Sequence, residues 1–447
     1  MRLFLFFTPC SLFTTRCLLL ATCYFLLTSC SIQKKISKSA HIILSTPELK
    51  TAHTGISIFE PATGKYWFNY QGDTYFIPAS NTKLPTCYAA MKYLKDSLVG
   101  LRYELSDEEV YIFPGGDPTF LHPDFKRQPV FDFLKNTGKK ITLNLSQWND
   151  QGLGNGWSWN DYNESYMAER SIMPMYGNVA RFSNQIKSLK VIPELFSGFV
   201  TRDSSRDENL YPSSVHRELG ANNFFIDGES DKETIIETPF YTGDEEIILK
   251  LLSDTLHKAV FQSRLLDGSN LSRIIIHSQP TDSLLKITMH RSDNFFAEQV
   301  LLMVSNEKLG IMNDQRIIDT LLNSDFKDLP QKPRWVDGSG LSRYNLFTPQ
   351  DFITILNMMK NEFGMERMKV ILPMGGTGTL TGYYKADSNY IFAKTGTLSA
   401  VVALSGYLYT KKNKLIIFSV LVNNHQAPAT AVRKNVEKFI RGIRNNY

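Results

Sequence analysis

The sequence predicts an α/β (α+β) protein in which an antiparallel sheet, assembled from strands at both chain ends, is flanked by helices. Strand-like runs at 52–60 and 65–70 stand near the N-terminus and three more stand near the C-terminus, with helical patterns between. Short apolar runs separated by Gly, Pro, Asn and Asp indicate a mainly β insert at 99–243. The 447 residues therefore divide into a main domain, 30–98 and 244–447, and that insert.

The N-terminal segment is typical of the leader of an exported protein. Arg2 and Arg16 are the only charged residues before Cys30, and the apolar run from Leu18 to Leu27 is shorter than a membrane-spanning helix requires. Leu27-Thr28-Ser29-Cys30 resembles the lipobox of bacterial lipoproteins. We therefore expect a lipoprotein signal peptide at 1–29 and a mature chain that begins at a lipid-carrying Cys30. A plain signal peptide and an uncleaved anchor are the alternatives.

The two N-terminal strands are joined by Pro61-Ala62-Thr63-Gly64, whose proline and glycine favour a tight turn. A helix is then expected from about Ser80, because apolar residues recur at intervals of three and four. These residues are Leu84, Cys87, Tyr88, Met91 and Leu94. Pro85 lacks an amide donor, so we expect a lost hydrogen bond or a kink in the first turns.

Helical patterns resume after the insert at 245–261, and the stretch 284–304 is strongly apolar. A further helix is predicted at 349–363, since Thr348-Pro349 supplies the residues preferred at an N-cap and a first helical position. The C-terminal region is predicted to contain three strands and then a basic helix. The strands are expected at 390–394, 401–409 and 415–422, and the helix at 427–444.

Composition argues against several classes of function. The formal net charge of +5 falls to +3 without the two arginines of the leader, which is too small and too evenly spread to predict nucleic-acid binding. Only Cys30 and Cys87 follow the leader, so no disulfide framework is available. The histidines form no closely spaced ligand pairs, and we expect neither a metal nor another cofactor. The lysines just after Cys30 predict a short tether: Lys34, Lys35 and Lys38.

Three motifs in order predict an acyl-transfer site: Ser80-Asn81-Thr82-Lys83, Ser292-Asp293-Asn294 and Lys394-Thr395-Gly396. A serine hydroxyl needs a positioned base, and a lysine three residues later on a helix lies on the same face. For Lys83 to act as that base, its pKa must fall from about 10.4 toward 7–8. Burial and a nearby positive charge can achieve this, and Lys394 is the candidate for that charge.

The second motif supplies a hydroxyl and an amide on either side of an aspartate. In an extended segment or a tight turn, Ser292 and Asn294 can point into one cleft. We expect Ser292 to pass a proton between Lys83 and the leaving amine. Asn294 is expected to orient Lys83 or a substrate carbonyl.

The third motif supplies groups that can bind a substrate. Lys394 and Thr395 are expected to hold a carboxylate, while Gly396 leaves room for a peptide laid along the strand edge. The main-chain amides of Ser80 and Thr397 are the expected donors to an oxyanion. Each motif alone is compatible with an ordinary structural role, namely an N-cap serine, a capping turn or a strand-end turn. Their occurrence together in this order favours the chemical interpretation.

The motif set is similar to that of penicillin-binding proteins and class A β-lactamases. Over roughly residues 40–445 the chain resembles, more specifically, the low-molecular-mass class C D-Ala-D-Ala carboxypeptidases/endopeptidases. The segments that carry this resemblance are Pro78 to Lys83, Arg291 to Glu298, Asp337 to Arg343 and Ala393 to Thr397. The 212 positions that separate Ser80 from Ser292 also fit a family with extra domains between its first two motifs.

The resemblance implies a serine β-lactamase/DD-peptidase-like fold and cleavage of peptidoglycan stem peptides through an acyl-enzyme on Ser80. It also implies that β-lactam antibiotics acylate the same serine. The expected location is the bacterial cell envelope, facing the periplasm, with attachment to the membrane through a lipid on Cys30. A class A-like β-lactamase is one alternative, although no Glu-x-x-Leu-Asn segment lies between the motifs. A non-catalytic envelope binding protein is the other.

Overall fold

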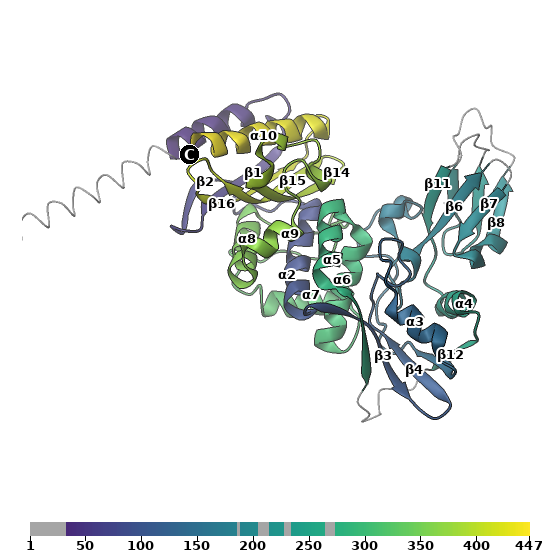
Figure 1. Ribbon diagram of the computed structural model, residues 1–447. Helices are drawn as coiled ribbons and strands as arrows, with labels where there is room; N and C mark the ends of the chain where they lie inside the picture. The colour runs from purple at the N-terminus through teal and green to yellow at the C-terminus, as the bar shows by residue number, and fades with distance from the viewer. Residues whose placement is uncertain (1–32, 186–187, 204–213, 228–233, 264–272) are drawn as a thin grey trace, which may run out of the picture.

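The computed structural model describes residues 33–185, 188–203, 214–227, 234–263 and 273–447, and the predicted leader and Cys30 lie outside them. Figure 1 shows a main domain, which contains both ends of the described chain, and an insert that extends to one side of it. Within the described ranges, no helix is both long and apolar enough to cross a membrane.

The main sheet has the strand order β14-β15-β16-β1-β2, and every neighbouring pair is antiparallel. Its strands are β1 (His53–Glu60), β2 (Lys65–Tyr70), β14 (Ile391–Leu398), β15 (Val401–Tyr409) and β16 (Leu415–Asn423). His53 near the N-terminus lies opposite Asn423 near the C-terminus, which confirms a sheet assembled from both ends. Because β14 continues to Leu398, the third motif lies inside a strand rather than at its end.

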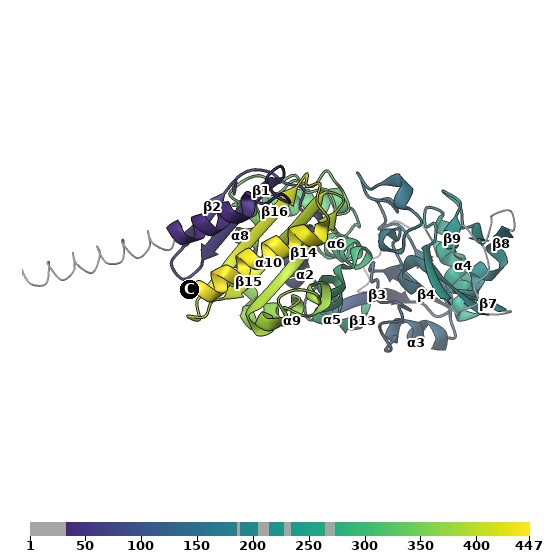
Figure 2. The ribbon, with the colours of Figure 1, turned by 90° about the horizontal axis from the view of Figure 1, so that it is seen from above.

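Both faces of this sheet are covered by helices (Figures 1 and 2). Alternate residues of β15 point to opposite faces, as the pleat requires. Leu404 therefore packs toward α10 (Ala429–Asn446), whereas Ala403 packs toward α2 and α8 on the other side. Further helices of this domain are α2 (Lys83–Tyr93), α5 (Thr281–Ile287), α6 (Asn294–Leu309), α7 (Asp314–Asn323), α8 (Pro349–Phe363) and α9 (Met365–Ile371).

The predicted tether is wrong for the residues that the structure describes. Residues 33–44 form a helix that packs beside α10 on the main sheet (Figure 2). Ile36, Ala40 and Ile43 are buried there, while the lysines that suggested a tether are exposed. The apolar residues recur at intervals of three and four, so one face of the helix joins the core and the lysines occupy the other.

Two local predictions in the helices have clear physical outcomes. Helix α8 begins as predicted, since the Thr348 hydroxyl accepts the Asp351 N–H and the Asp351 carboxylate accepts the Thr348 N–H. Helix α2 runs unbroken through Pro85, so the predicted kink is absent. Pro85 is the third helical residue, where an N–H would have no acceptor within the helix.

The insert is mainly β, as predicted, with the sheet orders β12-β5-β4-β3-β13, β8-β10-β9 and β11-β6-β7. The strands are β3 (Ser97–Leu105), β4 (Glu109–Pro114), β5 (Lys140–Asn144), β6 (Val179–Gln185), β7 (Ser188–Ile192), β8 (Val200–Asp203), β9 (Ser214–Arg217), β10 (Phe224–Asp227), β11 (Thr234–Pro239), β12 (Val260–Ser263) and β13 (Ile274–Pro280). Helices α3 (Pro129–Asn136) and α4 (Glu245–Leu256) pack on the same core.

The sheet pairing indicates where the insert joins the main domain. The chain enters the insert through β3 and returns through β13, and these two strands pair antiparallel, with Ser97 opposite Pro280. Strand β12 and helix α4 also belong to the insert, although both follow residue 243. We therefore propose that the insert spans 97–280, a longer segment than the predicted 99–243.

Candidate active site

Ser80 lies in a 3₁₀ turn, η1 (Ala79–Thr82), and Lys83 is the first residue of α2. Side chains three residues apart eclipse each other in a 3₁₀ turn, and here Lys83 Nζ donates to Ser80 Oγ at 3.0 Å. Lys83 is fully buried, whereas Ser80 is half-buried. The predicted pair is therefore formed, with the hydroxyl accessible and the amine enclosed.

The turn that carries Ser80 is conformationally unusual. Ala79 has a φ of +47°, in the left-handed region that costs a residue with a side chain about 1–2 kcal/mol. Gly340 faces it with a φ of +88°, and a Cβ atom on Gly340 would lie only 2.0 Å from the Ala79 carbonyl oxygen. The close approach of the loop at Gly340 thus holds the nucleophile turn in place.

Lys83 Nζ has two further partners, the Asn294 Oδ1 atom at 2.6 Å and the Ser339 carbonyl oxygen at 2.7 Å. Burial lowers the pKa of Lys83 to about 8, against the opposing influence of the carboxylates of Asp337 and Glu298. The positive charge of Lys83 lowers the pKa of Lys394, as described below. Burial is therefore the cause that brings Lys83 into the range of a general base.

The second motif lies at the junction of a π-helix, η6 (Thr288–Ser292), with α6. Ser292 ends the π-helix with a φ of +62°, and the Asp293 carboxylate caps α6 by accepting the Phe296 N–H at 2.9 Å. Asn294 then begins α6, and its Nδ2 donates to the Tyr166 carbonyl of the insert at 2.9 Å. The segment is therefore a tight turn, and it points both side chains of the motif at the two lysines.

The third motif places a second buried lysine beside the second motif. Lys394 Nζ donates to Ser292 Oγ at 2.8 Å and to the Thr395 carbonyl at 2.7 Å. Burial lowers the pKa of Lys394 well below its usual range, and the positive charges of Lys83 and Arg433 lower it further. Lys394 thus holds the Ser292 hydroxyl in the site.

The main chain of β14 faces the site along its outer edge. Ala393 N–H donates away from β15, to the Pro373 carbonyl at 3.0 Å. Because main-chain groups alternate sides along a strand, the N–H and C=O groups of Thr395 and Thr397 face that same outer edge. The Thr397 N–H therefore points away from β15, and the Thr397 residue is exposed.

Gly396 lies against the nucleophile turn. A Cβ atom at this position would lie 2.7 Å from the Pro78 carbonyl oxygen and 3.1 Å from the Ser80 nitrogen. The absent side chain therefore lets β14 approach the nucleophile turn. The same contact shows that the Ser80 amide lies against β14.

The structure thus gathers all the predicted residues around one place, and it adds groups that the motifs did not reveal. Ser339 contributes its main-chain carbonyl, and Tyr166 does the same from the insert. Arg433 of α10 donates to the Thr397 hydroxyl. The Asp-Gly-Ser-Gly loop was a recognisable signal for Ser339, but a main-chain acceptor leaves no signature at the position of Tyr166. A pocket of about 310 Å³ opens beside Ser292 and Asn294, against the insert.

In this site one serine is hydrogen-bonded to a buried lysine, and a second serine is hydrogen-bonded to a second lysine on the edge strand of the sheet. This arrangement defines a serine acyl-transfer enzyme of the β-lactamase-like class. Residues 36–447 match the D-Ala-D-Ala carboxypeptidase 3 (S13) family, and the chain therefore belongs to that family. Membership confirms both the predicted family and the predicted enzyme class, a serine-type D-Ala-D-Ala carboxypeptidase.

Curated relatives include a D-alanyl-D-alanine carboxypeptidase of Actinomadura sp. (strain R39), 24% identical over 87% of this chain and 80% of that protein. Another is the D-alanyl-D-alanine carboxypeptidase DacB of Haemophilus influenzae, 22% identical over 85% of this chain and 87% of the relative. The crystal structure of penicillin binding protein 4 (dacB) from H. influenzae superposes with a TM-score of 0.70 at 19% identity, covering 92% of this chain and 98% of the other. The predicted fold class is thereby confirmed.

Proposed function

We propose that this protein is a DD-peptidase that hydrolyses the terminal D-Ala-D-Ala bond of peptidoglycan stem peptides through an acyl-enzyme on Ser80. The hydrogen bond from buried Lys83 to the Ser80 hydroxyl carries this proposal. The names of the curated relatives support the carboxypeptidase activity. A solved structure of a predatory peptidoglycan endopeptidase from Bdellovibrio bacteriovorus, with a TM-score of 0.51 at 13% identity over 88% of this chain and 94% of the other, shares the fold.

In acylation, neutral Lys83 takes the proton of Ser80 Oγ while that oxygen attacks the carbonyl carbon of the penultimate D-Ala. The N–H groups of Ser80 and Thr397 stabilise the negative charge on the carbonyl oxygen, a contribution of a few kcal/mol in such sites. The proton then passes from Lys83 through the Ser292 hydroxyl to the leaving nitrogen. The C–N bond breaks, and free D-Ala departs.

Deacylation repeats the same steps with water as the nucleophile. Lys83 takes a proton from water, the hydroxide oxygen attacks the ester carbonyl, and the proton returns to Ser80 Oγ as the C–O bond breaks. The product is a stem peptide shortened by one residue. In the resting site Lys83 Nζ lies within hydrogen-bonding distance of Ser80 and Asn294, and Ser292 lies within that distance of Lys394 Nζ.

We assign substrate binding to the outer edge of β14. A peptide laid along this edge pairs with the main chain of Thr395 and Thr397, and its C-terminal carboxylate meets Lys394 and the two threonine hydroxyls. Asn294 orients the base and the acyl side of the substrate. β-Lactams occupy the same place and acylate Ser80, a proposal supported by the solved complex of the H. influenzae protein with a β-lactam.

Incubation of the mature protein with purified peptidoglycan fragments tests the proposed activity. We expect release of D-Ala from pentapeptides, and cleavage of cross-linked fragments if endopeptidase activity is also present. A pentapeptide with an amidated C-terminus is expected to react far more slowly, because the carboxylate anchor is lost. Unchanged fragments would instead support a non-catalytic binding protein, and rapid turnover of penicillin without peptide cleavage would support a β-lactamase.

We further propose that the protein is a lipoprotein of the cell envelope, exported by a signal peptide over 1–29 and held at the membrane by a lipid on Cys30. The proposal rests on the sequence Leu27-Thr28-Ser29-Cys30. Mass spectrometry of the mature N-terminus is expected to find a lipid-modified Cys30 as the first residue. An unmodified Cys30 would rule out this anchor.

A further inference from the structure

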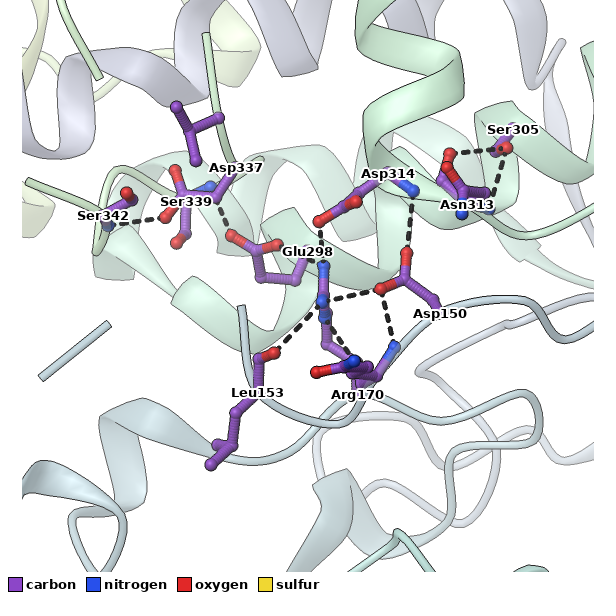
Figure 3. Close-up of polar contacts among 12 residues, drawn as sticks. Asp150, Leu153, Arg170, Glu298, Ser305, Asn313, Asp314, Asp337, Ser339 and Ser342 are labelled. Carbon is purple, nitrogen blue, oxygen red and sulfur yellow. Dashed lines mark hydrogen bonds and ion pairs between the residues drawn. The ribbon is translucent and has the colours of Figure 1, made fainter. Parts of the chain in front are cut away.

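A buried arginine of the insert gathers three carboxylates beside the active site (Figure 3). Arg170 lies in the insert and is almost completely buried. Its guanidinium nitrogens lie 2.9 Å from Asp150, 2.6 Å from Asp314 and 3.5 Å from Glu298. The Trp157 ring covers the guanidinium, with its centroid 5.6 Å from Cζ. Rotation of the guanidinium away from these carboxylates would leave buried charges without partners, which is unfavourable. The arrangement therefore fixes the guanidinium in one orientation.

Glu298 connects this arginine with the catalytic base. Its Oε1 atom accepts the Ser339 N–H at 2.7 Å, and the Ser339 carbonyl in turn accepts from Lys83 Nζ at 2.7 Å. Glu298 also lies four residues after Asn294 on α6, so one helix carries both a direct and an indirect partner of Lys83. An unbroken line of contacts therefore runs from Arg170 in the insert to the base.

A second contact from the insert holds the same loop. Trp157 Nε1 donates to the Asp337 carboxylate at 3.0 Å. Asp337 also accepts the N–H groups of Gly340 at 2.8 Å and Ser342 at 2.6 Å, which folds the loop around Ser339 (Figure 3 shows Asp337, Ser339 and Ser342). The insert therefore supports the loop that presents the Ser339 carbonyl to Lys83 directly through Trp157 and indirectly through Arg170 and Glu298.

We propose that Glu298 and Arg170 are positioning residues for Lys83: Arg170 orients the Glu298 carboxylate, and Glu298 fixes the Ser339 main chain that holds the base. The insert would then support the acylation step itself, whatever peptidoglycan contacts it also makes. This inference rests on the proposed function, since it assigns a role in acylation of Ser80.

The charges around Lys83 give this proposal a measurable consequence. Besides Glu298, the carboxylates of Asp337 and Asp293 face Lys83, and each raises its pKa, while Lys394 is the neighbouring cation. Burial and the charge of Asp337 raise the pKa of Glu298 to about 8, whereas Arg170 acts to lower it, and Asp314 to raise it. Glu298 therefore gains its charge over the same pH range in which Lys83 loses its proton. Once Glu298 is charged, it favours the protonated form of Lys83 and so opposes the last part of that proton loss.

The test is the pH dependence of acylation of the mature protein by a chromogenic cephalosporin. Glu298→Gln keeps an acceptor for the Ser339 N–H but cannot gain the charge that Glu298 gains as the pH rises through about 8, so we expect the rate of acylation to reach its plateau at a lower pH than in the wild type. Glu298→Met removes the acceptor as well, and we expect a roughly 10- to 100-fold slower rate at every pH. Arg170→Lys should recover part of the activity that Arg170→Met loses, because it retains the charge.

A matched control is Asp387→Asn, which neutralises another buried carboxylate, one bound by Arg441 and Arg444 beneath α10. It should lower stability without moving the pH profile of acylation. A folded Glu298→Gln protein with the wild-type profile would overturn the positioning role while leaving the proposed function intact. A wild-type protein that is never acylated would overturn the proposed function itself, so the two failures are distinguishable.

Discussion

The Ser80→Ala variant is expected to lose both covalent labelling by a fluorescent penicillin and release of D-Ala from a pentapeptide. No acyl-enzyme can form without the Oγ atom, and replacing the nucleophile of such a site lowers turnover by about 10⁴- to 10⁶-fold. The fold should persist, because the side chain is small and half-buried. The free energy of unfolding should therefore change by less than about 1 kcal/mol. Gel fluorescence and chromatographic detection of D-Ala provide the two measurements.

The chain offers a matched control for this variant in Ser324, which also begins a Ser-x-x-Lys sequence with Lys327. The Ser324 hydroxyl donates to the Thr320 carbonyl at 2.7 Å in an exposed position at the end of α7. Ser324→Ala should label and turn over like the wild type. Undiminished labelling of Ser80→Ala would exclude Ser80 as the nucleophile, and with it the proposed mechanism.

The sequence predicted those parts of the site that depend on local geometry. Ser80 and Lys83 lie three residues apart at the start of a helix, so their contact follows from helical geometry alone. The strands at both chain ends alternate or are continuously apolar, and Thr348-Pro349 marks a helix start that the structure reproduces. Such signals are short in range and need no knowledge of tertiary packing.

Other features depend on packing between distant segments and leave no local signal. The positive φ values at Ala79 and Ser292 occur in residues that carry side chains, where glycine would have been the usual marker. Gly396 is visible in the sequence as a glycine. The carbonyl oxygen that leaves no room for a side chain there belongs to Pro78, which lies 318 positions earlier in the chain. Arg170 and Glu298 are charged residues whose burial only the assembled insert and α6 produce. In the same way, the apolar face of residues 33–44 is buried in a core that α10 and the main sheet supply from distant parts of the chain.

Replacement of the base is expected to have the second large effect. In the wild type, the rate of acylation should rise as the pH increases through about 8, because the fraction of neutral Lys83 rises and only that form accepts the Ser80 proton. Lys83→Met fills a similar buried volume without an amine, so acylation should slow by roughly 10²- to 10⁴-fold and lose this pH dependence. Stopped-flow measurement with a chromogenic cephalosporin between pH 6 and about 9 would follow both effects, within the range around the lysine pKa.

Lys92, which also lies on α2, provides a matched control for the loss of a lysine from this helix. Its ammonium lies near the surface and pairs with Asp325 at 2.7 Å, away from Ser80. Lys92→Met should retain both the wild-type acylation rate and its rise with pH. The variant Lys83→Arg should be acylated as slowly as Lys83→Met, since a guanidinium stays protonated throughout this pH range and cannot accept the serine proton. Methionine has no amine that could accept the Ser80 proton. If Lys83→Met nevertheless kept the wild-type rate and pH profile, another group would have to be the base.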